Sequence, residues 1–324
     1  MRYAKNMLEL IGKTPLVKLN KVTSTKHIIL VKLESFNPGG SVKDRIGIFM
    51  LEQAEKEGKI KPGATIIEPT SGNTGVGLAL ACILKGYKLI CVLLDKAPQE
   101  KIRLLEAYGA KCIVCPTNVP PDDEQSYYKT AERLSKEIPN SYMPQQYQNP
   151  MNPLAHYTTT GPEIWEQTEH KLTHFVCGIG TGGTIYGVAK YLKEQNSTIK
   201  IIGVDTVGSV YTDYFYTHKL PEPKPYLIDG IGEDMIPGTI DFAYIDSIIQ
   251  ITDKEAYEMT IRLVREEAIL TGSSSGAAIA AVLKVAPSLP LESVTVVLLP
   301  DTGVKYLSKI NKEWYKEHNF YYPD

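Results

Sequence analysis

The chain has 324 residues, of which 43% are hydrophobic and 22% charged, and its formal net charge at pH 7 is −2. A near-neutral balance without basic clusters argues against a nucleic-acid-binding protein, and the length allows a large core arranged in two lobes. No apolar segment approaches the roughly 20 residues needed to cross a membrane, and none follows the first residues as in a secretory signal. We therefore expect a cytoplasmic protein without a nucleic-acid or membrane partner.

Short β-branched segments alternate with longer segments of helical periodicity along the chain. The expected strands are residues 28–33, 65–67, 88–94, 112–114, 174–177, 200–204 and 294–299. The expected helices include residues 42–57, 74–84, 100–108, 185–194 and 254–268. This alternation predicts an α/β fold of mostly parallel sheets with helices on both faces. Sheet-forming stretches before and after Asn149–Pro153 suggest two lobes with the active site in the cleft, because ligands bind beyond the carboxyl ends of parallel strands.

Cysteine and histidine residues give no metal-binding pattern. The five cysteines are an odd number and lie mostly among apolar residues, which favours a reduced protein. Cys112 and Cys115 form a C-x-x-C motif, but on a strand these positions face opposite sides of the sheet. The six histidines form no ligand pair at helical spacing, so we predict no metal site.

The first chemical motif is Asn37-Pro38-Gly39-Gly40-Ser41-Val42-Lys43-Asp44-Arg45. Its glycines permit a tight turn, and Ser41 can cap the helix that follows. Lys43 then falls in the first helical turn, where the helix dipole disfavours an ammonium and favours a nucleophilic amine. A solvated lysine that merely follows a cap is the alternative interpretation.

The second motif is Glu68-Pro69-Thr70-Ser71-Gly72-Asn73-Thr74-Gly75, between a strand and a helix. Its hydroxyls, its amide and the backbone N–H groups of a helix start suit a carboxylate or a phosphate. A well-capped loop would use the same residue types, so this motif alone leaves both interpretations open.

The third motif is Gly178-Ile179-Gly180-Thr181-Gly182-Gly183-Thr184, also between a strand and a helix. Its glycines let backbone N–H groups approach a phosphate. Gly178, Gly180 and Gly183 also fit the dinucleotide fingerprint, with Asp205 at the end of the next strand. An NAD-dependent oxidoreductase is therefore an alternative function, although it explains neither Lys43 nor the second motif.

The fourth motif is Thr271-Gly272-Ser273-Ser274-Ser275-Gly276-Ala277-Ala278, at the start of another helix. Alone it indicates a capping turn. Together the four motifs provide a reactive lysine, an anion site, a phosphate loop and a neutral hydroxyl. This combination suits pyridoxal phosphate, whose aldehyde reacts with a lysine and whose phosphate needs donors.

With these motifs in this order, the chain resembles the fold-type II, tryptophan-synthase β-like pyridoxal-phosphate enzymes, and among them the cysteine synthase and cystathionine β-synthase group. The resemblance extends from about residue 7 to residue 320 and includes Leu299-Pro300-Asp301. It implies an N-terminal lobe of residues 1–12 and 36–149 and a C-terminal lobe of residues 13–35 and 150–324.

The resemblance also assigns roles to individual residues. It implies that Lys43 forms the Schiff base with pyridoxal 5′-phosphate. Asn73 would bond the cofactor's 3′-oxygen, and Ser274 would face its pyridine nitrogen. The cofactor phosphate would be held by Gly180, Thr181, Gly182, Gly183 and Thr184. The substrate carboxylate would be held by Thr70, Ser71, Asn73, Thr74 and Gln146.

The implied reaction is β-replacement on serine, O-acetylserine or cysteine by a thiol (homocysteine, sulfide or cysteine), through an aminoacrylate. The stretches 139–142 and 229–237 look most like cystathionine β-synthases, whereas 159–165 and 273–276 look equally like O-acetylserine sulfhydrylases. Cystathionine β-synthase-like activity is our first expectation, cysteine synthase is the alternative, and hydrogen sulfide release from cysteine is a shared activity. A homodimer is implied by the resemblance alone. A non-enzymatic descendant is disfavoured by Lys43.

Two departures from the cystathionine β-synthase pattern concern an acidic trio. Asp229 stands where these enzymes usually carry Glu, and Glu233 stands where the animal and yeast enzymes carry Tyr. With Asp234 they place three carboxylates within a short loop, which we expect to act as general acids or bases toward the leaving group and the thiol. A solvated acidic turn is the alternative. The haem-binding extension and the C-terminal regulatory domain of the animal enzyme have no counterpart in this sequence, so neither haem nor S-adenosylmethionine regulation is predicted.

Overall fold

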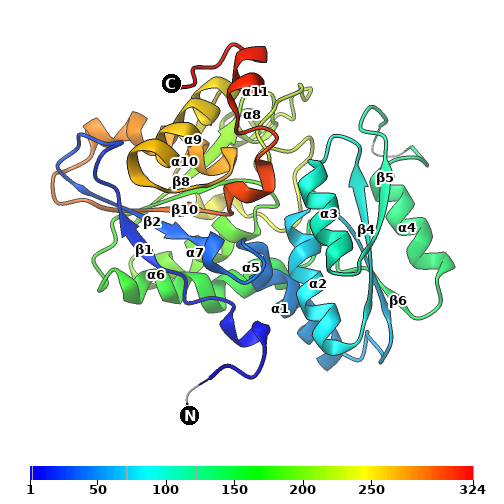
Figure 1. Ribbon diagram of the computed structural model, residues 1–324. Helices are drawn as coiled ribbons and strands as arrows, with labels where there is room; N and C mark the ends of the chain where they lie inside the picture. The colour runs from blue at the N-terminus through cyan, green and yellow to red at the C-terminus, as the bar shows by residue number, and fades with distance from the viewer. Residues whose placement is uncertain (2, 71, 121–122, 324) are drawn as a thin grey trace. The chain divides into compact units, whose positions relative to one another are not determined.

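The computed structural model describes residues 1, 3–70, 72–120 and 123–323 (Figure 1). The chain divides into two compact units, of which unit 1 comprises residues 1–11 and 37–152 and unit 2 comprises residues 12–36 and 153–324. The junction between Asn152 and Pro153 falls within the Asn149–Pro153 segment. No helix in the described part of the chain is long and apolar enough to span a membrane.

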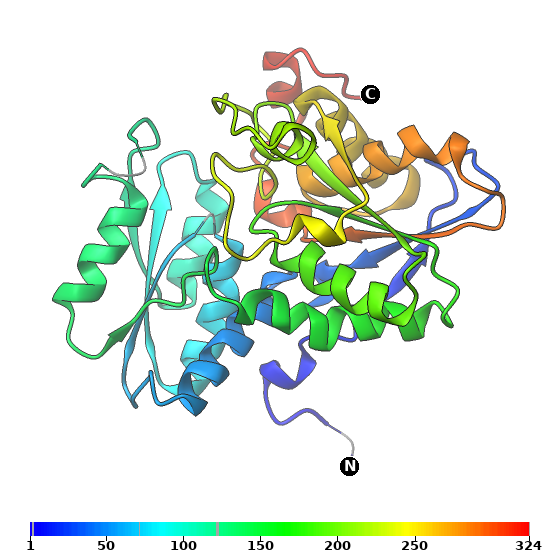
Figure 2. The same ribbon diagram turned by 180° about the vertical axis from the view of Figure 1, so that it is seen from behind.

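Unit 1 is built on a parallel sheet whose described strands follow the order β5-β4-β3-β6. These strands are β3 (Thr65–Pro69), β4 (Lys88–Leu94), β5 (Lys111–Cys115) and β6 (Ser141–Tyr142). The helices are η1 (Met7–Leu10), α1 (Lys43–Lys56), α2 (Asn73–Lys85), α3 (Gln99–Ala107) and α4 (Tyr127–Glu137). Helices α2 and α3 cover one face of the sheet, with α1 against α2, and α4 covers the other (Figures 1 and 2). Both faces are therefore buried, as parallel sheets require.

Unit 2 is built on a larger sheet whose described strands follow the order β1-β2-β10-β7-β8-β9. These strands are β1 (Leu16–Lys18), β2 (Ile28–Leu33), β7 (His174–Gly178), β8 (Lys200–Thr206), β9 (Ser247–Ile251) and β10 (Val294–Leu299). Only the β1–β2 pair is antiparallel among the strand pairs of the described chain. The predicted α/β class with mostly parallel sheets is confirmed.

Helices cover both faces of the unit 2 sheet, with α9 and α10 on one side and α6 and α7 on the other (Figures 1 and 2). Helix α5 (Met151–Ala155) spans the junction. After it come the π-helical turn η3 (His156–Thr160), α6 (Gly161–Gln167), α7 (Gly183–Gln195) and α8 (Tyr211–Thr217). Later in the chain come α9 (Asp253–Glu267), α10 (Ser273–Val285) and α11 (Lys312–Glu317). Short 3₁₀ turns are η2 (Glu34–Phe36), η4 (Phe242–Tyr244), η5 (Ala286–Ser288) and η6 (Gly303–Tyr306).

Local sequence explains where several of these elements begin and end. Thr252 and Glu255 form a reciprocal capping box that starts α9. Gly86 ends α2 in the left-handed conformation, with φ at 75°. Cys112 and Cys115 lie on β5 as expected, and none of the five cysteines, which lie in the described part of the chain, forms a disulfide.

Two glycines bring α1 and α2 into direct backbone contact in unit 1. A Cβ atom at Gly47 would lie 2.4 Å from the carbonyl carbon of Gly77, and one at Gly77 would lie 2.5 Å from the carbonyl oxygen of Lys43. Because α1 begins at Lys43 and α2 begins at Asn73, this contact fixes the two helix starts relative to each other.

We predict that Gly77→Ala destabilises the protein by about 1–3 kcal/mol, because the new methyl group would overlap backbone atoms that cannot rotate away. The gain in helix propensity, at most about 1 kcal/mol, is smaller than this cost. Urea unfolding measures the change. Ile83→Ala, at a position 53% exposed on α2, is the control and should change stability by no more than about 0.5 kcal/mol. Equal stability of Gly77→Ala and the wild type would show that the two helices can separate without cost.

Candidate active site

Lys43 is the first residue of α1, as the sequence predicts, and its side chain is half-buried. The helix cap differs from the expectation. The N-cap residue is Val42, not Ser41, although the buried Ser41 hydroxyl still accepts the Lys43 backbone N–H at 3.3 Å. The helix thus starts one residue later than a Ser41 cap would give, although Val42 already has helical backbone angles, with φ −57° and ψ −22°. The Lys43 side chain therefore extends from the first turn of α1 in unit 1.

The second motif forms the start of α2 in the same unit. Gly72 is the N-cap with φ at 120°, a conformation open to glycine, and its N–H donates to Thr70 Oγ1 at 3.0 Å. Thr70 and Thr74 are buried, and Asn73 is half-buried. Ser71 lies outside the described residues.

Gln146 is brought beside this motif by the loop that follows β6. The Thr74 hydroxyl donates to Gln146 Oε1 at 2.5 Å, and Gln146 Nε2 donates to the Pro69 carbonyl at 3.1 Å. The structure thus joins Thr74 and Gln146, residues that lie far apart in the sequence. The two side chains act as one polar unit at the end of β3.

Glu68 holds the loop that carries Gln146 by hydrogen bonds to its backbone. This fully buried carboxyl group accepts the backbone N–H groups of Gln145 and Gln146, both at 2.8 Å. Burial raises the pKa of Glu68 to about 8, although the two backbone hydrogen bonds act in the opposite direction. Through these two bonds the Glu68 carboxyl group fixes the loop that carries Gln146.

In unit 2 the glycine-rich third motif connects β7 to α7. Gly182 is the N-cap of α7 in the left-handed conformation, with φ at 81°. A Cβ atom there would lie 2.4 Å from Ile240, and one at Gly180 would lie 2.6 Å from the Gly230 carbonyl oxygen. Glycine is thus required at both positions, and the first N–H groups of α7 have no acceptor within the helix.

The backbone of this loop is oriented through its carbonyl groups. The Gly232 N–H donates to the Ile179 carbonyl at 2.8 Å, the Tyr211 hydroxyl to Gly180 at 2.5 Å and the Thr239 hydroxyl to Thr181 at 2.5 Å. In a trans peptide the N–H group points away from the carbonyl group of the same plane.

The N–H groups of Gly180, Thr181 and Gly182 share these peptide planes. They therefore point away from the three groups that donate to the carbonyls. Successive backbone N–H groups of a turn can form an anion-binding concavity.

Residues 229–234 connect this loop to Ser274. The Asp229 N–H donates to Ser273 Oγ at 3.1 Å, and a Cβ atom at Gly230 would lie 3.9 Å from Ser274 Oγ. A few residues later, the Gly232 N–H donates to the Ile179 carbonyl of the loop Gly178–Thr184, which we call the phosphate loop. Ser274 is buried at the second position of α10, so one segment of unit 2 adjoins both predicted cofactor contacts.

The three residues of the acidic trio lie in different environments. Asp229 forms an ion pair of 2.7 Å with Lys309, which favours the ionised carboxylate. Glu233 is half-buried, and its N–H donates to Ser209 Oγ at 3.1 Å. Asp234 is exposed. Asp229 and Glu233 thus remain candidates for proton transfer, whereas Asp234 has the setting of a solvated turn residue.

Asp205, which suggested a dinucleotide site, is fully buried at the end of β8. Its carboxylate accepts the backbone N–H of Thr212 at 2.9 Å and the Thr212 hydroxyl at 2.7 Å. These bonds fix the start of α8, from which Tyr211 reaches the phosphate loop. Asp205 therefore has a role within the fold that requires no nucleotide.

The described residues fit pyridoxal phosphate. The loop from Gly180 to Thr184 offers successive backbone N–H groups and two hydroxyls to a phosphate, and any side chain larger than glycine at residue 180 or 182 would overlap neighbouring atoms. Ser274 offers a neutral hydroxyl, and Lys43 offers an amine. This donor set matches an anionic phosphate and an aldehyde, not a metal ion.

Several residues that build the site were missed by the sequence analysis. Tyr211 and Thr239 act on the phosphate loop from distant segments and have no local signal. Glu68 had one, because it is a charged residue directly after the apolar Ile66 and Ile67 of a strand. Lys101 is buried, and its aliphatic stem lies beneath Gly72.

The comparison with family models decides the classification. A model described as pyridoxal-phosphate dependent enzyme matches residues 7–301. The chain belongs to this family. Its cofactor is pyridoxal phosphate, and the predicted family and cofactor are confirmed.

Individual members of this pyridoxal-phosphate enzyme family are similar over nearly the whole chain. A cystathionine beta-synthase of Apis mellifera is 46% identical over 315 residues, which are 96% of this chain and 62% of that protein. A cysteine synthase of Staphylococcus aureus is 45% identical over 305 residues, covering 94% of this chain and 95% of that protein. The chain spans about three fifths of the length of the cystathionine beta-synthases it matches.

A solved structure shares the fold of this pyridoxal-phosphate enzyme. The O-acetylserine dependent cystathionine beta-synthase of Helicobacter pylori superposes with a TM-score of 0.87 at 41% identity, covering 95% of this chain and 99% of that one.

The buried Glu68 leads to a prediction about pH and stability. Between the ordinary carboxyl pKa of 4.5 and the raised value of about 8, the folded protein holds a proton on Glu68 that the unfolded chain has released. Stability should therefore fall as the pH rises through this range, by on the order of 2 kcal/mol between pH 6 and pH 8. Glu68→Gln cannot ionise and should lack this decline. Urea unfolding of both proteins at several pH values measures it, and parallel curves would contradict the prediction.

Proposed function

We propose that this chain catalyses pyridoxal-phosphate-dependent β-replacement, in which a thiol replaces the β-substituent of serine, O-acetylserine or cysteine, with cystathionine β-synthase-like activity first. The observation that carries the proposal is the phosphate loop of unit 2, whose three oriented peptide planes adjoin the segment next to a buried serine. The named activities of the relatives support it.

Lys43 has two roles in this proposal. Its amine would hold the cofactor aldehyde, and as a free amine it would remove the proton from the substrate Cα and later return it. Its place in the first turn of α1 suits proton transfer, because the positive end of the helix dipole favours the neutral amine. When bound, pyridoxal phosphate supplies an electron-withdrawing ring that makes this Cα–H bond acidic.

The start of α2 would bind the substrate carboxylate. Thr70, Thr74 and Gln146 are linked by hydrogen bonds to one another or to neighbouring backbone, and Glu68 fixes the loop beneath them. We assign the carboxylate to this group together with Ser71 and Asn73, and Asn73 also to the cofactor 3′-oxygen. A prearranged site of this kind orients the Cα–H bond of the substrate.

Ser274 would supply a neutral hydrogen bond to the pyridine nitrogen. A serine, unlike an aspartate, does not stabilise a protonated ring, so the electron demand at Cα stays moderate. This arrangement favours prompt loss of the β-substituent over other fates of the deprotonated substrate.

The donor and the acceptor are separate questions. A cysteine synthase using O-acetylserine and sulfide is the second candidate, because the Staphylococcus aureus enzyme matches over 95% of its own length. Release of hydrogen sulfide from cysteine would use the same residues. We also propose that the enzyme is a cytoplasmic homodimer, as the resemblance implies, and size-exclusion chromatography with light scattering tests the oligomeric state.

Purified protein assayed with each donor against homocysteine and sulfide tests the proposed function. We expect the wild type to show the visible absorption of cofactor-bound lysine and to form cystathionine. Lys43→Ala should lose the absorption band and at least a factor of about 100 in kcat, because it lacks the proton-transferring amine. Normal turnover by Lys43→Ala would refute the assignment.

The acidic loop predicts a difference between donors. Hydroxide and thiolate are poor leaving groups that require proton transfer, whereas acetate leaves readily. Asp229→Asn and Glu233→Gln should therefore lower kcat/KM for serine and cysteine about tenfold more than for O-acetylserine. Asp234→Asn, at an exposed position of the same loop, is the matched control. Equal losses with all donors would mean that the loop has a structural role only.

A further inference from the structure

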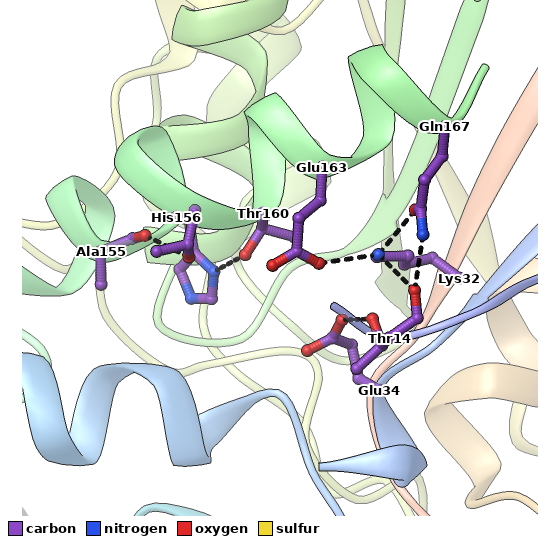
Figure 3. A network of polar contacts seen from close by, with 9 residues as sticks. Thr14, Lys32, Glu34, Ala155, His156, Thr160, Glu163 and Gln167 are labelled. Carbon is purple, nitrogen blue, oxygen red and sulfur yellow. Dashed lines mark hydrogen bonds and ion pairs between the residues drawn. The ribbon is translucent and has the colours of Figure 1, made fainter. Parts of the chain in front are cut away.

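His156 lies behind the phosphate loop and contacts it through one hydroxyl group. The imidazole is fully buried at the first position of the π-helical turn η3. Its Nδ1 lies 2.9 Å from Thr160 Oγ1, as Figure 3 shows, and its Nε2 lies 3.2 Å from Thr184 Oγ1. Thr184 belongs to the phosphate loop, so His156 contacts a predicted cofactor ligand from the protein side. Single π-helical turns often occur at functional sites.

Close packing holds the ring at this position. On α7, a Cβ atom at Gly187 would lie 2.1 Å from the Pro153 carbonyl oxygen and 2.9 Å from His156 Cβ. The segment that carries His156 can approach α7 this closely only because residue 187 has no side chain. The imidazole consequently has little freedom to turn away from Thr184.

The helix after η3 is anchored by a buried amine. Lys32, with a fully buried side chain, donates to Glu163 at 2.9 Å, to Gln167 at 2.8 Å and to the Thr14 carbonyl at 2.7 Å (Figure 3). Glu163 and Gln167 lie on α6, so these bonds attach α6 to β2. The turn that carries His156 is thus fixed at its far end as well.

The chemistry of a phosphate ligand determines the direction of each hydrogen bond in this chain. A phosphate oxygen accepts, so the single Thr184 hydroxyl proton must point toward it. Thr184 Oγ1 must then accept from His156, which requires the proton to be on Nε2. Nδ1 of the neutral ring is then an acceptor and takes the proton of the Thr160 hydroxyl.

We propose that His156 is a positioning residue that donates from Nε2 to Thr184 and so directs the Thr184 hydroxyl proton toward the cofactor phosphate. This inference rests on the proposed function, because it requires a bound phosphate. Without the Nε2 donor, the Thr184 proton can turn to other acceptors, and the phosphate loses an oriented hydrogen bond. The effect belongs to the phosphate and not to the ring of the cofactor.

The test compares two substitutions that retain different halves of the histidine. His156→Gln places an amide nitrogen near the position of Nε2 and keeps a donor to Thr184, whereas His156→Asn keeps only the contact with Thr160. We expect His156→Asn to bind pyridoxal phosphate about tenfold more weakly than the wild type, and His156→Gln to stay within about threefold. Affinity for pyridoxal, which lacks the phosphate, should change less than threefold in both variants.

Two further readouts separate positioning from general damage to the fold. The ³¹P chemical shift of the bound cofactor should move in His156→Asn and return toward the wild-type value in His156→Gln. In a Thr184→Val background, His156→Asn should have no additional effect on cofactor affinity, because it acts through the missing hydroxyl. If His156→Asn does not fold, Thr160→Val carries the same test, with an expected loss of about threefold.

The outcomes also separate this inference from the proposed function. Failure of the wild type to bind pyridoxal phosphate would refute the proposed function itself. Normal binding by the wild type, together with an unchanged affinity and ³¹P shift in His156→Asn, would overturn only the role of His156. Equal weakening of pyridoxal and pyridoxal phosphate would overturn it too, because the effect would not depend on the phosphate.

Discussion

An anion site made of backbone N–H groups works only if the peptide planes are held in one orientation, and the structure of unit 2 follows from this constraint. Glycine allows the required backbone but does not hold it. The holding groups are donors from three other segments, which bind the carbonyls of Ile179, Gly180 and Thr181. Each donor that fixes a carbonyl also fixes the adjoining N–H, which points away from that donor. Electrostatic prearrangement of this kind avoids reorganisation when the anion binds.

In unit 1 a loop backbone is also held in one orientation, here by a carboxyl group that accepts N–H groups. Glu68 receives two backbone N–H groups and thereby fixes the loop that carries Gln146. The cost is a buried acid whose pKa rises to about 8. In both units, side chains that need not touch the cofactor or the substrate therefore orient the residues that we propose to bind them. Buried polar groups with satisfied hydrogen bonds provide this orientation, because leaving them unpaired would be costly.

The sequence predicted the local part of this arrangement well. The strands at 28–33, 88–94 and 294–299 agree with β2, β4 and β10 to the residue, because each is rich in β-branched and other apolar residues with a single polar residue. Strands β1, β6 and β9 and helices α4, α5, α6, α8 and α11 were not among the expected elements. They are short or carry many polar residues, so tertiary contacts decide their conformation.

The same distinction holds for the site. Glycine and hydroxyl motifs are visible locally, and their positions at the ends of β3 and β7 and the starts of α2, α7 and α10 follow from the predicted elements. The supporting bonds are not visible, since Tyr211 and Thr239 reach the phosphate loop from segments distant in the sequence. Pairing a donor with an acceptor at such separation requires the sheet topology, which periodicity does not supply.

In the segment 229–234 the backbone and the acidic side chains have separate roles. Its backbone and apolar atoms support the phosphate loop. Ile231 packs against Gly178, and the Gly232 N–H donates to the Ile179 carbonyl. The side chains of Asp229 and Glu233 are not needed for those contacts. Asp229 is instead set by its ion pair with Lys309, near the end of the chain. Under the proposed function, substitutions at these two acids would therefore change proton transfer to the leaving group or the thiol while the phosphate loop keeps its geometry. The proposed donor preference would then depend on side chains whose backbone is fixed by the loop it supports.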